Sequence, residues 1–140
     1  MTVDEVKAEL KRVRQAKQIY RLTADRANDY EQTITGGKTV RYGGNGESHE
    51  RRGNPVENAY CELISLKDDK EQHRREYIAA FNRARHLIDL VADPVQREVL
   101  DRRYMRGELW EDIAYNMHYS RQHINRLHGW ALQAIARQAE

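Results

Sequence analysis

The sequence is poor in the residues that stabilise small domains by cross-linking or by dense aromatic packing. Its 140 residues include one cysteine, Cys61, two prolines and one phenylalanine. A single cysteine excludes an internal disulfide framework and is typical of a reducing cytoplasm; we expect its thiol to lie half-buried on a helix. No apolar run approaches the roughly 18 residues of a membrane helix, and the early charges Asp4, Glu5 and Lys7 are untypical of a signal peptide. These absences predict a soluble, cytoplasmic protein with no membrane partner.

Patterns typical of catalytic and metal sites are missing as well. No two histidines stand four residues apart, and His123 and His128, five apart, point in different directions on a helix. Cys61 has no activation motif beside it, and neighbouring carboxylates such as Asp68 and Asp69 diverge. We therefore expect no catalytic residue, no metal and no cofactor, and we do not expect an enzyme.

What the sequence does contain is helical periodicity, beginning in residues 1–33. Thr2 and Glu5 form a capping box at the start of this segment. The stripe that follows is narrow, which indicates a helix lying on another helix or pairing between chains. Lys and Arg fill much of the remaining surface, and we interpret them as a solvated face rather than a track for phosphates. The stripe comprises Val3, Val6, Leu10 and Val13.

Residues 34–55 lose this periodicity and hold six of the eight glycines. A segment of this composition cannot offset its ordering entropy by burial, so we expect a flexible linker. An alternative, which we favour less, is a segment that follows a phosphate backbone. Its candidate residues are Arg41, Tyr42, Arg51 and Arg52.

A second long helix is predicted over residues 56–92, because Asn54 can cap it and Pro55 takes its first position. Its seam keeps a 3-4 alternation for five heptads, which is a coiled-coil register. We expect the first helix to fold back antiparallel on it, and two such hairpins to pair as a homodimer. The seam comprises Val56, Ala59, Leu63, Leu66, Lys70, His73, Tyr77, Ala80, Ala84, Leu87 and Val91.

The last segment, residues 93–140, opens with Asp93 as a helix cap and Pro94 at the first helical position. Two short helices follow over Leu109–Ala136, and Ser120 is the expected N-cap of the second. Each helix carries one apolar stripe that we expect to be buried. The stripes comprise Val95, Val99, Leu100 and Tyr104 in the opening helix, Leu109, Ile113, Ala114 and Met117 in the next, and Ile124, Leu127, Ala131, Leu132 and Ile135 in the last.

The polar face at the start of the last helix is the most informative feature. Arg121, Gln122, Asn125 and Arg126 share one exposed face of its first two turns. Arg can form two hydrogen bonds to guanine, and Asn or Gln can do so to adenine. From Arg121 to Arg137 the chain has three Arg and no acidic residue, which favours phosphate. The pattern predicts major-groove binding; the alternative is an ordinary amphipathic hairpin with a solvated face.

The last segment of the chain resembles region 4 of sigma-70-type factors over about 45 residues. Trp110 to Leu132 is still more similar to small phage and prophage proteins that are loosely grouped with the ArpU and RinA type of late-gene transcription regulators. Two positions depart from the sigma pattern: His118 stands where many members have Gly, and Asn125 where a basic residue is frequent. The resemblance rests on Glu111-Asp112-Ile113-Ala114, Met117, Tyr119-Ser120-Arg121, Ile124, Leu127 and Ala131-Leu132.

The resemblance implies an all-α protein in which a long helical hairpin is followed by a sigma-region-4-like helix-turn-helix. It implies that Arg121, Gln122, Asn125 and Arg126 read bases of double-stranded DNA. Phosphates would be held by Ser120, Arg102, Arg103 and Arg106. The expected role is transcription regulation by a phage or prophage in the cytoplasm of a bacterial host, with RNA polymerase as a further candidate partner.

Two other functions remain open from the sequence. Small DNA-packaging subunits, as in terminases, also join a helix-turn-helix to an oligomerising helical arm. A polymerase-binding or anti-sigma-like adaptor would use the same fold to bind protein instead of DNA.

Overall fold

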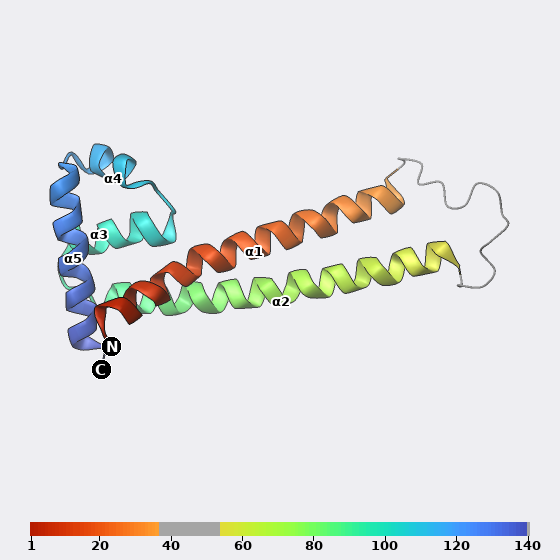
Figure 1. Ribbon diagram of the computed structural model, residues 1–140, viewed down its shortest axis with the longest axis horizontal. Helices are drawn as coiled ribbons and strands as arrows, with labels where there is room; N and C mark the ends of the chain where they lie inside the picture. The colour runs from red at the N-terminus through yellow and green to blue at the C-terminus, as the bar shows by residue number, and fades with distance from the viewer. Residues whose placement is uncertain (37–53, 140) are drawn as a thin grey trace. The chain divides into compact units, whose positions relative to one another are not determined.

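The computed structural model describes residues 1–36 and 54–139, and every regular element in them is helical (Figure 1). The predicted all-α class is therefore confirmed. None of these helices is long and apolar enough to cross a membrane. The elements are α1 (Val3–Thr35), α2 (Pro55–Asp89), α3 (Pro94–Leu100), the π-helical turn η1 (Asp101–Met105), α4 (Trp110–Met117) and α5 (Arg121–Gln138).

The predicted linker falls mostly on residues that the structure does not describe. Helix α1 continues to Thr35, two residues beyond the predicted end, and α2 begins at Pro55 and ends at Asp89. Residues 37–53 lie outside the described part of the chain. So do the alternative phosphate-following residues Arg41, Tyr42, Arg51 and Arg52.

The helix starts follow the predicted capping chemistry. The Glu5 backbone N–H donates to Thr2 Oγ1 at 3.2 Å, and the Thr2 N–H donates to Glu5 Oε2 at 3.0 Å. Asn54 Oδ1 accepts from the Val56 N–H at 2.9 Å at the start of α2. Asp93 Oδ1 accepts from the Val95 N–H at 3.0 Å at the start of α3. Each cap satisfies a backbone donor that would otherwise lack an intrahelical partner.

The chain divides into two compact units, which we call the terminal unit (Met1–Lys17 with Glu76–Glu140) and the middle unit (Gln18–Arg75). In the terminal unit, the start of α1 packs against the end of α2, η1 and α5. This main core includes Val6, Leu10, Val13, Ala80, Ala84, Leu87, Leu100, Tyr104, Ala131, Leu132 and Ile135.

A second core in the terminal unit joins α3, α4 and α5 through Val99, Ile113, Ile124 and Leu127. The predicted stripe of α5 is therefore buried, while in the predicted stripe of α4 Ile113 is buried and Ala114 and Met117 are partly buried. Leu109 was expected inside but is 57% exposed, because it occupies the N-cap of α4 rather than its first turn.

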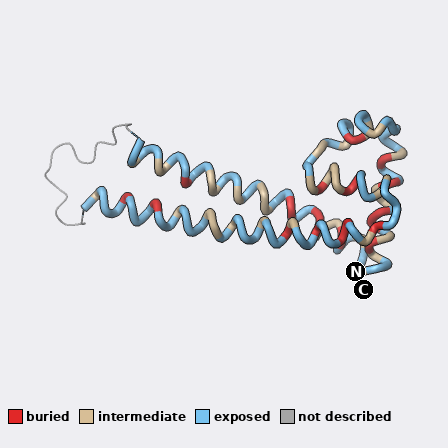
Figure 2. Tube along the Cα trace, turned by 180° about the vertical axis from the view of Figure 1, so that it is seen from behind, coloured by how far each residue is buried: buried red, intermediate tan, exposed pale blue. Residues whose placement is uncertain are grey.

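The middle unit buries much less. Among its described residues only Ala27, Ala59 and Leu63 are buried (Figure 2). The two helices run antiparallel in this unit, as predicted (Figure 1), and Lys67 Nζ of α2 pairs with Glu31 Oε1 of α1 at 3.1 Å. Two expectations are wrong here: Val56, the first seam position, is 49% exposed, and Cys61 is exposed rather than half-buried.

A change of helical pitch at η1 was not foreseen from the sequence. The Arg106 N–H donates to the Asp101 carbonyl at 3.0 Å, one residue further than an α-helical bond. Gly107 then takes a φ of 74°, in the left-handed region that glycine adopts without steric cost. This bulge and turn end the α3 segment and orient the arginines at 102, 103 and 106 differently from a regular helix.

Candidate nucleic-acid interface

Helices α4 and α5 are joined by a tight turn that is closed by two backbone hydrogen bonds. The His118 N–H donates to the Tyr115 carbonyl at 3.3 Å, and the Tyr119 N–H donates to the Ala114 carbonyl at 3.0 Å. This pair of bonds is a Schellman motif, which requires a left-handed residue after the helix. His118 supplies it with a φ of 60°. The turn that glycine often makes is therefore formed here by histidine.

Ser120 then begins α5. Its side-chain oxygen accepts a hydrogen bond from the His123 N–H at 3.1 Å, which confirms the predicted N-cap. Because the first backbone N–H groups of α5 point out of the helix start, this end carries partial positive charge and favours an anion.

The four predicted base-reading side chains lie together at this start. Arg121, Gln122, Asn125 and Arg126 are all exposed, while Ile124 between them is fully buried. Within the described residues, no hydrogen bond or ion pair occupies the Arg121 or Arg126 guanidinium. The first two turns of α5 therefore present two unpaired cations and two amides to solvent.

A stack of side chains that includes His128 of α5 supports this helix. Its members are Arg103, Trp110, His128 and Tyr104. The Arg103 guanidinium carbon lies 4.7 Å from the centre of the Trp110 ring. Trp110 meets His128 edge-on with centroids 4.7 Å apart, and His128 stacks on Tyr104 at 5.8 Å. A 2.8 Å hydrogen bond joins Tyr104 Oη and His128 Nε2. The stack thus connects η1, α4 and α5.

Burial and neighbouring cations shift the pKa values of three side chains in the stack. Burial, and after it the positive charges of Lys7, Arg103 and Lys11, lower the pKa of His128 to about 4. His128 is therefore neutral at pH 7. Burial raises the pKa of Tyr104 to about 12. Burial also lowers the pKa of Arg103, and Arg14 and Arg121 contribute in the same sense.

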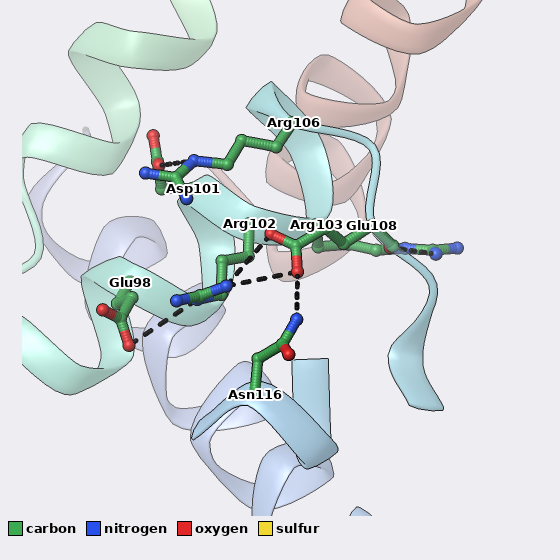
Figure 3. Close-up of polar contacts among 7 residues, drawn as sticks. All are labelled: Glu98, Asp101, Arg102, Arg103, Arg106, Glu108 and Asn116. Atoms are coloured by element: carbon green, nitrogen blue, oxygen red, sulfur yellow. Dashed lines mark hydrogen bonds and ion pairs between the residues drawn. The ribbon is translucent and has the colours of Figure 1, made fainter. Parts of the chain in front are cut away.

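Arg102, predicted to hold a phosphate, is directed into the protein instead (Figure 3). Its Nη1 donates to both carboxylate oxygens of Glu108 at 3.2 and 3.3 Å, and its Nε lies 3.7 Å from Glu98. Asn116 of α4 also donates to Glu108, at 3.2 Å. With a side chain only 20% exposed, Arg102 fastens η1 to the following turn.

The other two candidate phosphate ligands point in different directions. Arg103 leaves the backbone away from Arg102, and its Nη1 donates to the Glu108 carbonyl at 3.0 Å (Figure 3). Arg106 is 62% exposed and pairs with Asp101 at 3.3 Å. The three arginines therefore do not form one cluster. Glu108 accepts hydrogen bonds from two of them, Arg102 and Arg103. This role of Glu108 was not predicted from the sequence, because only the turn at Gly107 brings its carboxylate back onto Arg102.

The described residues contain no group of three His, Cys, Asp or Glu side chains arranged to hold a metal ion. What the site offers is a set of hydrogen-bond donors and positive charges on a helix held by two cores. Such a surface can bind an anion or the edges of bases without any bond being made or broken.

Comparison with known proteins yields one family. A family model described as "Protein of unknown function (DUF1492)" matches residues 44–136, which include α2, α3 and α4 and most of α5. No curated protein and no solved structure matches the chain.

Proposed function

The chain belongs to the DUF1492 family, and we propose that it binds double-stranded DNA sequence-specifically through the first two turns of α5. The observation that carries this proposal is the exposed set Arg121, Gln122, Asn125 and Arg126 on a capped, well-packed helix start. Helix-turn-helix proteins insert this end of the second helix into the major groove. Arg, Asn and Gln are the side chains that form paired hydrogen bonds with base edges there.

Phosphate contacts flanking the groove complete the proposal. The helix start behind Ser120 offers free backbone N–H groups, and Arg103 of η1 and Arg106, which directly follows η1, keep part of their side chains accessible. Arg102 is left out of this set, because it is held by Glu108. Its role in the proposal is to fix the turn that precedes α4.

The regulatory role is proposed from the resemblance of Trp110 to Leu132 to sigma region 4 and to small phage and prophage regulators. A regulator of this kind acts at promoter DNA, with RNA polymerase as a neighbouring partner. We also propose a homodimer paired through the long helices. Its support is the set of large apolar side chains left exposed in the middle unit: Ile19, Leu22, Tyr60 and Ile64.

The direct test is selection of bound sequences from a random pool of DNA duplexes. A short recovered motif, or two half-sites about one helical turn apart, is the expected result. Arg126→Ala should weaken binding to that motif by about 1–3 kcal/mol while leaving the fold unchanged. Arg137→Ala is the matched control, because Arg137 is exposed on the same helix but lies in its last turn. Equal binding by the two variants would contradict the groove assignment.

The same measurements separate the alternatives. Salt-sensitive binding without any recovered motif, together with a native mass of eight or more subunits, would favour a DNA-packaging subunit. Affinity for duplex DNA that does not change with salt would favour a protein-binding adaptor, because phosphate contacts release counterions and make binding strongly salt-dependent.

A further inference from the structure

The N-terminal helix carries a row of cations beside its buried stripe. Lys7, Lys11 and Arg14 stand at i, i+4 and i+7, so they share one face of the first four turns of α1. The acidic Glu9 lies on the other side of the stripe, where it pairs with Arg12 at 2.9 Å and Arg83 at 3.6 Å. Asp4 stands three residues before Lys7 on the face of the row, so three cations share that face with one carboxylate, and Glu9 does not neutralise them.

These first turns of α1 lie on α5. The N-terminal amino group of Met1 donates to the Ala139 carbonyl at 3.0 Å. Further along α1, Val6 and Leu10 belong to the same buried cluster as Ala131 and Ile135 of α5. These contacts are with the second half of α5, while the candidate interface is formed by its first two turns, so the start of α1 and the interface share one helix. All these contacts lie within the terminal unit.

The row lies beside the stack, because Tyr104 of the stack belongs to the same buried cluster as Leu10 and Val13, the neighbours of Lys11 and Arg14 in α1. Electrostatic effects on two side chains of the stack agree with this packing. The charges of Lys7 and Lys11 lower the pKa of His128, and the charge of Arg14 lowers the pKa of Arg103. Arg103 is affected in the same way by Arg121, the first residue of α5. The Arg103 guanidinium of η1 thus feels the charge of one cation from α1, Arg14, and of one from α5, Arg121.

Gathering like charges in this way is unfavourable for the isolated protein. The acidic residue nearest to Arg103 on its C-terminal side, Glu108, has both carboxylate oxygens bonded to Arg102. An external polyanion would offset the repulsion. The row also has the right extent: the seven residue-to-residue steps from Lys7 to Arg14 span about 10 Å of helix, close to the axial length of three phosphates on one DNA strand.

We propose that Lys7, Lys11 and Arg14 form a second phosphate-binding surface, which contacts the DNA backbone beside the groove occupied by α5. Arg103 connects this surface to Arg121. The inference rests on the proposed function, since it assigns a further part of the same protein–DNA contact. It also revises the interpretation of these cations as a solvated face, which considered α1 without its neighbours.

The test uses a triple variant of the full chain, Lys7→Gln/Lys11→Gln/Arg14→Gln. The matched control, Arg12→Gln/Arg85→Gln/Arg137→Gln, removes three exposed cations from other faces of the terminal unit. Affinity for a duplex of random sequence is measured between 50 and 300 mM salt. The slope of log K against log salt should fall by about 0.9 for each phosphate that the variant no longer binds, and the affinity by up to about eightfold per phosphate at 0.1 M salt. The control should keep a slope close to that of the unmodified chain.

A readout without DNA tests the geometry separately. Removing Lys7 and Lys11 should raise the pKa of His128, followed by NMR titration of its ring, while the control should leave it unchanged. Thermal unfolding of both triple variants checks that each folds, and the single variant Arg14→Gln repeats the salt measurement with the smallest disturbance.

The outcomes distinguish the two proposals. If the unmodified chain binds duplex DNA without salt dependence, the proposed function fails, and this inference fails with it. If the unmodified chain binds with a steep slope and both triple variants keep that slope, only the α1 surface is wrong. An unchanged His128 pKa in the first triple variant would also overturn the inference, because the row would then lie too far from the stack.

Discussion

The terminal and middle units are built partly from the same two helices, yet they differ greatly in what they bury. Among the described residues of the middle unit only Ala27, Ala59 and Leu63 are buried, whereas the terminal unit has two clusters of larger side chains. Two helices alone cover only a narrow stripe of each other. Where η1 and α5 add a further layer, Leu10 and Leu100 become fully enclosed. The difference therefore comes from the number of packed layers rather than from helix propensity.

This contrast has an energetic consequence. Because hydrophobic stabilisation grows with the apolar area removed from water, the terminal unit should hold most of the folding free energy. The middle unit should open locally at lower cost. The surface proposed for DNA lies on the more stable unit, which suits a site that must hold several side chains in fixed positions. The middle unit keeps exposed apolar side chains, which are available for the proposed pairing with a second copy of the chain.

The largest expected effect comes from truncating one leucine in each unit. Leu100→Ala should lower the free energy of unfolding by about 3–4 kcal/mol, because its fully enclosed side chain leaves a cavity. Leu63→Ala, in the thinner layer, should lower it by about 1–2 kcal/mol, since water can reach the vacated space. Urea unfolding followed by circular dichroism at one protein concentration measures both. Equal reductions would contradict the thinner packing assigned to the middle unit.

Acid should weaken the terminal unit selectively. The folded chain holds the pKa of His128 at about 4, below the value of about 6.5 expected in the unfolded chain. Above pH 6.5 both states are neutral and His128 has no effect. As the pH falls from 6.5 to 4, the unfolded chain binds the proton first, so stability drops, by up to about 2–3 kcal/mol.

Hydrogen exchange at pH 7 and pH 4.5 would show whether this destabilisation falls on α5 more than on the middle unit. His128→Gln supplies the control, because it cannot take up a proton and should remove the pH dependence between 6.5 and 4. If the parent chain keeps the same stability across this range, the burial assigned to His128 is wrong.

Removing a helix cap should lower the free energy of unfolding by different amounts in the two units. Ser120→Ala removes the bond to the His123 N–H and should reduce the free energy of unfolding by about 1 kcal/mol. Asn54→Ala removes the equivalent bond to the Val56 N–H at the start of α2. Its effect on global unfolding should be smaller, because that end can open without disturbing the terminal unit. Thermal melts of the two variants under identical conditions make the comparison.

The smallest effect is expected at the turn before α5. His118 has a φ of 60°, which costs an L residue energy that glycine avoids. His118→Gly should therefore stabilise the terminal unit by about 0.5–1 kcal/mol, reduced by the extra entropy of glycine in the unfolded chain. His118→Ala should give no such gain. A denaturation series with the parent, Gly and Ala variants would reveal a destabilising Gly substitution, which would contradict the left-handed assignment.

Much of the fold followed from short-range sequence signals. The capping box at Thr2 and the caps at Asn54, Asp93 and Ser120 were predicted and occur as bonds in the structure. The apolar stripe of α5 was predicted and is buried. Errors occurred at the ends of helices, at Leu109 and Val56, where periodicity continues but no neighbouring helix covers the position. Cys61 is exposed because it lies off the seam, between the buried seam positions Ala59 and Leu63.

The sequence by itself determined where helices begin, which face of each is apolar and which polar side chains gather at the start of α5. These properties depend on residues within one or two turns of each other. The tertiary structure decided which cations remain available: it turned Arg102 onto Glu108 and brought Lys7 and Lys11 within range of His128. Residues so distant along the chain meet only through packing of the core, and no local pattern encodes that meeting.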